Sequence, residues 1–442
     1  MKRIRWIALA AVLCLLCSGC SLDVESFLRP PRVQGEQQAI QAALETYMLD
    51  SGGAAGRYVL KYPVEGDHTA AFSLCDETGR PTEEDARMAV AFYSFTATPE
   101  EVHINLLRRE GDDWVSVADA VGAGVAIRQV AFGDLDGDGS AEIVTGWSTY
   151  SNRVHQMVVY DTEGGLHPLE GSRLYTALYV GDLTAENKDS LLLLHNSGAE
   201  SVTATRAYAE AGRLVTAETV ALDGSVEQFG RMTLCRLAAG VHGLFVEGYK
   251  TTGETVTELI YYNDKGLCAP FYDPSTNRTT VTTRAGQLAA RDVDGDGMVE
   301  IPYSRLLNEH ADNKIGGTLT VWRAWDYASG QWLDRAHTVV NTEDRYLITL
   351  DRERVDTLAT TYDTATHTLD LADKDTRQVW LRLTVGEYEM SAPEENMRSL
   401  TLFSEDEGSL TCTAWYDPKV LRAEKVRYMV SRLTEQGGGV DA

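Results

Sequence analysis

A strand-rich unit of about 50 residues recurs along this chain, and this repeat constrains the fold more than any other feature. Each unit holds a hairpin with a glycine in its tight turn, and these turn glycines are Gly111, Gly164, Gly212, Gly266 and Gly330. The strands before the turns are mostly rich in Val, Tyr, Leu or Trp, of which Val, Tyr and Trp favour β-strands. Glycine suits the positive φ of a hairpin turn. The repeat therefore predicts an all-β fold.

Each unit offers about four strands, which is the content of one β-propeller blade. A lone four-stranded unit of this size buries little apolar surface, so neighbouring units must pack face to face. We therefore expect a β-propeller over residues 57–340 with about five blades, and six or seven are also compatible with the chain length.

Residues 341–442 break the repeat and predict a small C-terminal α+β domain, or alternatively a sixth blade. Strands are expected over residues 345–350, 366–372, 377–386, 398–404 and 409–417, followed by a closing helix over 421–433. Before the repeats, apolar residues at helical spacing predict one amphipathic helix over residues 36–48.

The N-terminal segment has the features of an export signal. Lys2, Arg3 and Arg5 precede an uncharged stretch over residues 6–17. This stretch is too short to cross a hydrocarbon core of roughly 30 Å, which needs about 20 residues. It suits the apolar core of a signal peptide, so residues 1–19 are expected to be one.

The end of this stretch, Leu16-Cys17-Ser18-Gly19-Cys20, resembles the lipobox of bacterial lipoproteins, which usually has an aliphatic residue where Cys17 stands. The resemblance implies cleavage before Cys20 and a diacylglycerol, with palmitate-type chains, on its thiol. The protein would then be a lipoprotein held on the extracytoplasmic face of the cell membrane, with residues 20–56 as lipidated cysteine, tether and helix. The alternative is an ordinary secretory signal that ends in a chance cysteine.

The chain is strongly acidic, with 66 Asp and Glu residues against 40 Lys and Arg residues and a net charge of -26. Such a surface repels the phosphates of nucleic acids. We therefore expect no nucleic-acid partner.

Four cysteines lie beyond the N-terminal region, namely Cys75, Cys235, Cys268 and Cys412. They are far apart and form no CxxC pair of the kind that binds zinc or carries out redox chemistry. Disulfides, which an extracytoplasmic setting permits, and isolated buried thiols both remain open.

Two loops crowd four carboxylates each into nine residues. The acidic residues are Asp134, Asp136, Asp138 and Glu142 in the first loop, and Asp292, Asp294, Asp296 and Glu300 in the second. Like charges at such range raise one another's pKa values, whereas Ca²⁺ takes six to eight oxygen ligands in a flexible shell. Backbone carbonyls of Ser140 and Met298 can complete the two rings. The sequence therefore predicts two Ca²⁺ sites.

These loops are not EF-hands, because Thr145 and Tyr303 stand where an EF-hand needs a glutamate, and strand patterns flank both loops. Residues 130–146 (VAFGDLDGDGSAEIVTG) and 288–304 (LAARDVDGDGMVEIPYS) instead resemble FG-GAP or VCBS repeats, the calcium-loop propeller repeats of integrin α subunits and many bacterial surface proteins. The resemblance implies that each loop joins two strands of one blade and binds calcium through four acids and one carbonyl.

A third loop departs from this pattern, because Thr184 and Ser190 stand where Asp136 and Glu142 stand in the first. The resemblance therefore gives the loop at Asp182 no complete set of ligands. The whole layout also resembles uncharacterised VCBS-type lipoproteins of Gram-positive bacteria, a resemblance that brings no known activity.

No GxSxG, HExxH or P-loop sequence is present, and the many carboxylates do not single out an acid/base pair. Trp147, Trp322, Trp325 and Trp332 could stack on sugars, but packing between and within blades is the favoured explanation. We expect a non-enzymatic binding or scaffolding module for a protein or glycan ligand. The alternatives are a glycan-active hydrolase or lyase with an axial carboxylate site, and an accessory protein of envelope assembly.

Replacing Cys20 by Ser tests the anchor, because it removes the thiol that would carry the lipid. We expect Cys20→Ser to lose incorporation of labelled palmitate and to leave the membrane fraction, whereas Cys17→Ser, the matched control, keeps both. Metabolic labelling followed by fractionation measures this. Label retained by Cys20→Ser would contradict the lipobox assignment.

Overall fold

The computed structural model describes residues 35–50, 58–64, 72–82, 84–149, 153–184, 186, 188–198, 200–286, 288–306, 318–386, 392–404 and 411–433. The expected signal peptide and Cys20 lie outside these residues. Helix α3 (Glu36–Asp50) confirms the helix predicted from Glu36. Its apolar stripe packs on the first sheet, where Ile40 and Leu44 are fully buried.

Most of the described chain forms six antiparallel sheets that follow one another along the sequence. The first contains β1 (Tyr58–Lys61), β2 (Phe72–Cys75), β3 (Met88–Phe95), β4 (His103–Glu110) and β5 (Asp113–Val121). The second contains β6 (Ile127–Gly133), β7 (Glu142–Ser148), β8 (His155–Asp161), β9 (His167–Pro168) and β10 (Arg173–Tyr175). The third contains β11 (Ala177–Gly181), β12 (Ser190–Asn196), β13 (Val202–Glu210) and β14 (Arg213–Ala221).

The remaining sheets continue the same order. The fourth contains β15 (Val226–Ala238), β16 (Val241–Lys250), β17 (Glu254–Asn263), β18 (Gly266–Cys268) and β19 (Arg284–Ala285). The fifth contains β20 (Glu300–Leu306), β21 (Thr318–Asp326), β22 (Gln331–Asn341), β23 (Tyr346–Leu350) and β29 (Val430–Arg432). The sixth contains β24 (Leu358–Asp363), β25 (Thr368–Asp373), β26 (Val379–Val385), β28 (Thr411–Tyr416) and β27 (Arg398–Ser404).

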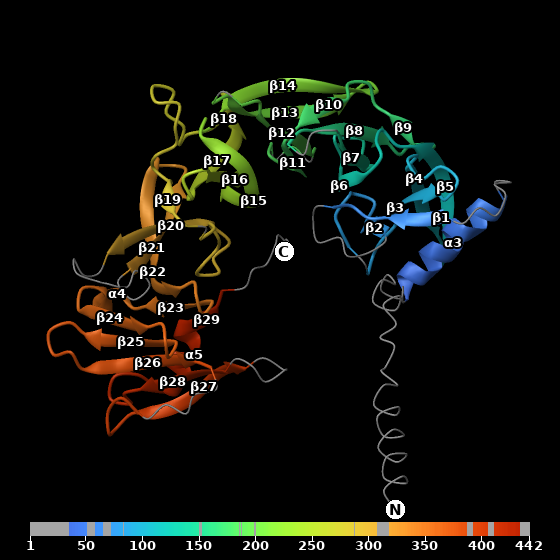
Figure 1. The fold of residues 1–442 in the computed structure, drawn as a ribbon. Helices are drawn as coiled ribbons and strands as arrows, with labels where there is room; N and C mark the ends of the chain where they lie inside the picture. Colours follow the sequence, from blue (N-terminus) through green and yellow to red (C-terminus); the bar gives the residue numbers. More distant parts are fainter. Residues whose placement is uncertain are drawn as a thin grey trace, which may run out of the picture.

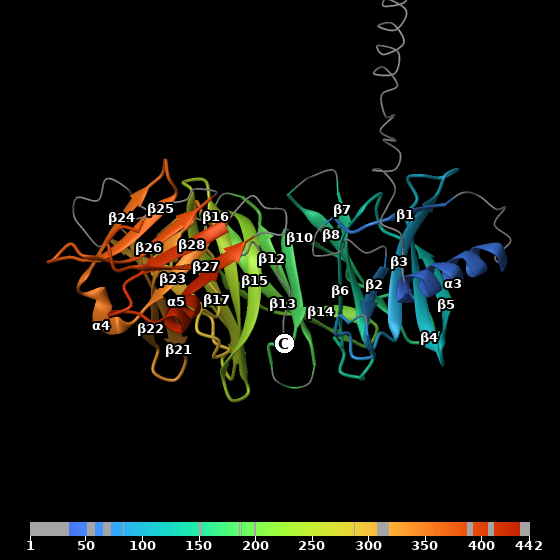
Figure 2. The same cartoon turned by 90° about the horizontal axis from the view of Figure 1, so that it is seen from below.

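The sheets are arranged around an arc, with the first and sixth sheets at its two ends (Figure 1). Strands β6, β11 and β15 are edge strands of their sheets and line the concave side of the arc. A view turned by 90° shows the strands of the first four sheets standing side by side along the arc (Figure 2). The fold is therefore all-β, with successive antiparallel sheets placed as propeller blades, as the sequence predicts.

Apolar side chains between successive sheets supply the expected burial. Phe92 of the first sheet meets the fully buried Trp147 of the second edge-on, with ring centroids 5.9 Å apart. Gly122 allows this contact, since a Cβ there would lie 2.0 Å from the Trp147 ring. Further buried clusters join the second sheet to the third, the third to the fourth, and the fourth to the fifth.

The hairpin turns confirm the repeat on which the sequence argument rests. The five turn glycines have φ values of 66°, 67°, 74°, 91° and 64° in chain order. These values lie in the left-handed region, which glycine adopts at no steric cost. The turn positions were therefore readable from glycine alone.

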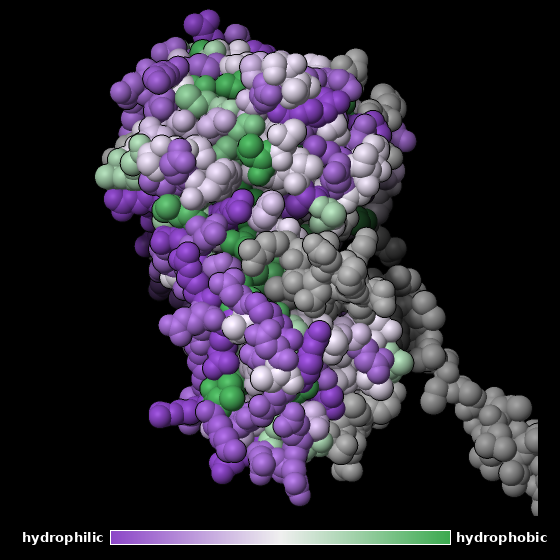
Figure 3. Space-filling view, turned by 90° about the vertical axis from the view of Figure 1, so that its left-hand side faces the viewer, coloured by the Kyte–Doolittle hydropathy of each residue, from purple (hydrophilic) through white to green (hydrophobic). Residues whose placement is uncertain are grey.

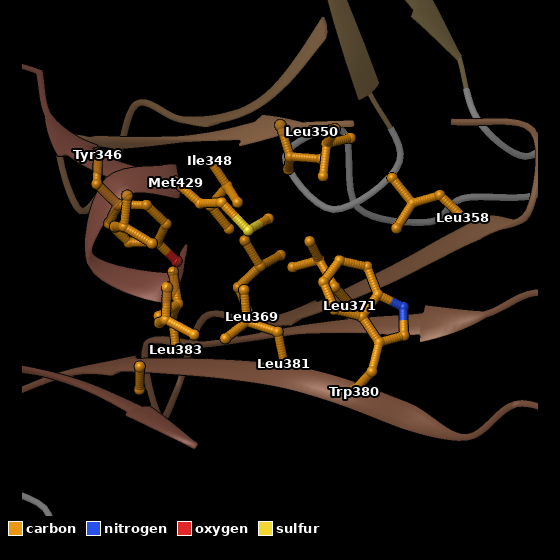
Figure 4. Packing of buried hydrophobic residues seen from close by; sticks show 14 of the residues in the cluster. Tyr346, Ile348, Leu350, Leu358, Leu369, Leu371, Trp380, Leu381, Leu383 and Met429 are labelled. Carbon is orange, nitrogen blue, oxygen red and sulfur yellow. The ribbon is translucent and has the colours of Figure 1, made fainter. Parts of the chain in front are cut away.

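The C-terminal region supplies a sixth sheet together with the short helices α4 (Arg352–Val355) and α5 (Ala423–Met429). Strand β23 pairs with β22, so the fifth sheet extends past residue 340, the expected end of the propeller. The fifth sheet, the sixth sheet and α5 share one core, in which Met429 of α5 lies beside Ile348 of β23 and near Leu369 of β25 (Figure 4).

The closing helix expected over residues 421–433 is wrong at its C-terminal end. Helix α5 stops at Met429 because the next three residues form β29, which pairs with β23 through Val430 and Ile348. Pairing with β23 satisfies the backbone N–H and C=O groups of β29, which in a longer helix would have formed hydrogen bonds within the helix. Local spacing alone did not reveal this long-range pairing.

The face formed largely by the fifth and sixth sheets is mostly hydrophilic, with hydrophobic residues in small patches (Figure 3).

Among the described helices, none has the length and apolar character to cross a membrane. Cys75, Cys235, Cys268 and Cys412 are free thiols, and all but Cys268 are buried.

Candidate functional site

The two acidic loops each bring three carboxylates together. In the first loop, Asp134, Asp136 and Glu142 each offer one oxygen, and these oxygens lie within 4.8 Å of one another. Asp292, Asp294 and Glu300 do the same in the second loop. The loops lie at equivalent places, because Glu142 begins β7 and Glu300 begins β20. Both clusters could hold a metal ion.

Backbone hydrogen bonds wrap each loop around its first aspartate. The carboxylate of Asp134 accepts from the N–H groups of Gly137 at 2.6 Å and Gly139 at 3.0 Å. Asp292 accepts in the same way from its two loop glycines, at 2.7 Å and 2.8 Å. Gly137 and Gly139 have φ values of 84° and 93°, which explains why glycine is required at these two positions.

The two glutamates are the buried members of the clusters. Oε2 of Glu142 accepts from the Leu135 N–H at 2.6 Å, and Oε2 of Glu300 accepts from the Val293 N–H at 2.9 Å. The other oxygen of Glu300, Oε1, is buried and has no hydrogen-bond partner. A buried charge without a partner is costly, so this oxygen is positioned as a ligand atom.

Electrostatics also favours a cation. Burial, reinforced by the neighbouring aspartates, raises the pKa of Glu142 to about 8 and the pKa of Glu300 to about 7. A bound cation would lower these pKa values again, because it stabilises the ionised carboxylates. The all-oxygen donor set fits a hard cation such as Ca²⁺ or Mg²⁺.

The fifth loop position differs between the two loops. Asp138 accepts from the Ser140 N–H at 2.7 Å and lies outside the close triplet. Asp296 accepts the matching hydrogen bond from the Met298 N–H at 2.9 Å. It also lies 2.5 Å from the guanidinium of Arg335, which contacts the sulfur of Met298 at 3.4 Å. Arg335 comes from β22, and its contact was missed from the sequence because it depends on strand pairing. Carbonyl ligation by Ser140 and Met298 stays a prediction.

The first loop is also a joint between the second and third sheets. Leu135 is fully buried in the cluster between these sheets, and its carbonyl accepts from the Ala209 N–H of β13 at 2.9 Å. The Asp189 N–H donates to the Asp134 carbonyl at 2.7 Å, and the Asp189 carboxylate accepts from the Asp134 N–H at 3.1 Å. A cation in this loop would therefore stiffen a contact between two blades.

The third loop follows a different course. The His242 imidazole lies 2.7 Å from the Asp182 carbonyl oxygen, and the Asp182 carboxylate accepts from the Thr184 N–H at 3.0 Å. In the described part of this loop, Asp182 belongs to no carboxylate triplet.

The tryptophans serve packing. Trp147 and Trp322 are fully buried. Trp325 and Trp332 are cross-strand partners, with ring centroids 5.1 Å apart, and both pack against Phe271. This confirms the packing explanation for the four rings.

A pocket of about 670 Å³ opens between the second, third and fourth sheets. Strands β6, β11 and β15 supply much of its lining, which places it on the concave side of the arc. Among the described residues that line it, Arg128, Arg153, His155 and Glu227 are the ionisable ones. Glu227 is the single carboxylate, and it lies 3.4 Å from the Arg153 guanidinium.

This pocket bears on the enzyme hypothesis. Glycoside hydrolysis by the common mechanism needs two carboxyl groups about 5–10 Å apart, whereas the described lining holds Glu227 alone. Sequence reasoning missed the pocket, because neighbouring strands of three sheets create it. Only the excess of arginines over carboxylates on strands β6, β11 and β15 could have indicated it.

No protein-family model matches the chain, and no curated protein matches it. Among solved structures, the chain is similar to a rhamnogalacturonan lyase from Bacillus licheniformis, with 15% identity over 78% of this chain and 74% of that chain and a TM-score of 0.32. It is similar to the Dos1 propeller at 10% identity, 81% of each chain and a TM-score of 0.31. It is also similar to an exo-β-1,3-galactanase from Phanerochaete chrysosporium at 9% identity, 82% of this chain, 90% of that chain and a TM-score of 0.29. None of these likenesses says what this chain binds or does.

Proposed function

We propose that this protein is a lipid-anchored extracytoplasmic lipoprotein whose calcium-stabilised β-propeller acts as a binding or scaffolding module. The concave pocket carries this proposal. It has the size of a ligand site, and the single carboxylate of its described lining, Glu227, already pairs with Arg153. This lining is suited to holding a ligand and lacks the paired acids that hydrolysis of a glycan requires.

Calcium is the cation proposed for the two acidic loops. Each loop offers several carboxylates on a glycine-wrapped backbone, and Ca²⁺ accepts six to eight oxygens at about 2.3–2.6 Å with flexible geometry. Mg²⁺ demands a near-ideal octahedron and keeps several waters. Because each loop supplies several protein oxygens close together, we expect Ca²⁺ to be preferred over Mg²⁺.

The anchor proposed at Cys20 suits the charge of the chain. With a net charge of -26, the protein gains no general electrostatic attraction to anionic lipid headgroups. Acyl chains contribute about 0.8 kcal/mol per buried CH₂ and do not depend on that attraction. A lipid on Cys20 would thus hold the propeller close to the membrane.

Calcium should raise the melting temperature of the full chain, because it binds the folded loops and not the unfolded chain. At a concentration 100-fold above Kd, each site would add about 2.7 kcal/mol to the free energy of unfolding. Replacing Asp134 and Asp292 together by Asn should abolish most of this gain, while the exposed control Asp113→Asn keeps it. An identical melting curve in excess calcium and in excess chelator would contradict the proposal.

The binding role predicts retention of an envelope polymer without turnover. We expect affinity electrophoresis of the full chain through gels that contain individual envelope polysaccharides to show retardation by at least one of them. Long incubation with the same polymer should release no new reducing ends and no unsaturated products. Product release that Glu227→Gln abolishes would favour the enzyme alternative and overturn the proposal.

A further inference from the structure

The concave side of the arc carries basic residues in an otherwise acidic molecule. Strands β6, β11 and β15 line this side (Figure 1). Their charged residues are Arg128, Arg231, Arg236 and Glu227, whereas the whole chain has 66 acidic against 40 basic residues. These three strands therefore carry more basic than acidic residues, in contrast to the whole chain.

Two of these arginines occupy irregularities of the strands. The pairing of β6 with β7 shifts register between Ile127 and Gln129, which leaves Arg128 as the extra residue. The pairing of β15 with β16 shifts between Phe229 and Met232, which leaves Arg231 in the irregular stretch. Bulges re-aim side chains and are frequent beside functional sites. Arg128 lines the concave pocket as a result.

His155 is a buried polar group that lines the same pocket. It is 3% exposed, and its Nδ1 atom has no hydrogen-bond partner. Its ring meets the edge of Tyr175 at 5.6 Å, and the Tyr175 hydroxyl also has no partner. Burial, followed by the nearby charge of Arg128, lowers the pKa of His155. The lowered pKa favours the neutral imidazole, which carries one N–H.

Arg231 of β15 and Arg291, just before β20, lie outside the pocket lining. Arg291 forms a bridge with Glu300 through the backbone at the inner edge of the fifth sheet, and its guanidinium lies 5.9 Å from the centroid of the Trp322 ring. The Nε atoms of Arg231 and Arg291 are buried without hydrogen-bond partners. A buried donor without a partner is costly, so an acceptor from outside the chain would stabilise these two Nε atoms.

We propose that the concave pocket binds a small organic oxyanion, with Arg128 and Arg153 holding its charged group and His155 donating a hydrogen bond to it. Guanidinium groups match the two oxygens of a carboxylate or phosphate. The volume of about 670 Å³ leaves room for a sugar-sized body. Gln129 and Gln228 add neutral polar groups, and Glu227 holds Arg153 at the rim. This inference rests on the binding role proposed above and names its ligand class.

Three related sugars test the proposal, because they share a ring and differ in charge. The full chain in neutral detergent, at constant calcium, is titrated with D-glucuronate, D-glucose 6-phosphate and D-glucose by calorimetry. We expect saturable binding of at least one of the two anions and none of glucose, and the preferred anion distinguishes a carboxylate from a phosphate. Absence of binding at about 10 mM, tenfold above a Kd of 1 mM, would overturn the inference.

Variants show whether the pocket is the site. We expect Arg128→Gln to weaken anion binding by at least about tenfold, because it removes a charge-assisted hydrogen bond. Arg236→Gln, on the same inner edge but outside the pocket lining, is the matched control and keeps wild-type binding. If Arg128→Gln does not fold, Arg153→Gln replaces it, since that side chain is 78% exposed. Equal loss in the control and the pocket variants would overturn the inference.

The outcome separates this inference from the function on which it rests. If neither anion binds while an envelope polymer is still retained, the ligand class is wrong and the binding role stands. If no polymer is retained and no anion binds, both fall, even where calcium still raises the melting temperature.

Discussion

Burial between successive sheets is the interaction on which the rest of this structure depends. The apolar faces of neighbouring sheets are buried against each other, and α3 packs on the first sheet. Trp147 fills the junction of the first and second sheets, and Leu135, near the start of an acidic loop, fills the junction of the second and third. The acidic loop is thus part of the apolar joint. The repeated hairpins, the cation clusters and the concave pocket all follow from this serial packing.

Some buried ionisable groups have charged partners in the structure, whereas others have a buried atom without a hydrogen-bond partner. In the fourth sheet, buried charges are paired: Lys250 lies 2.8 Å from Asp223, and Arg284 lies 2.8 Å from Glu247. The chain can therefore satisfy buried ions when it places them in a core. Glu300 Oε1 and His155 Nδ1 have no such partners. Glu300 belongs to the second carboxylate cluster and His155 lines the concave pocket, so an external ligand at either place could supply a partner.

Much of the fold could be predicted from the sequence, because its turns and loops depend on residues that are close together in the chain. The hairpin turn at Gly111 and the loop from Asp134 to Glu142 depend on residues adjacent in the chain. Features that depend on long-range pairing could not be predicted. Strand β29 forms because Val430 pairs with Ile348. Arg335 contacts Asp296 across the fifth sheet. Arg128 lines the pocket at a register shift between β6 and β7. The two carboxylate clusters could therefore be predicted from the sequence, and the pocket could not.

The central claim is that the two acidic loops are calcium sites that complete the joints between blades. Equilibrium dialysis of the metal-free full chain against radioactive calcium tests it most directly. The account predicts two bound ions per chain, one of which is lost in Glu142→Gln and the other in Glu300→Gln, with binding retained in a large excess of Mg²⁺. No bound calcium, or binding that neither substitution reduces, would contradict the account.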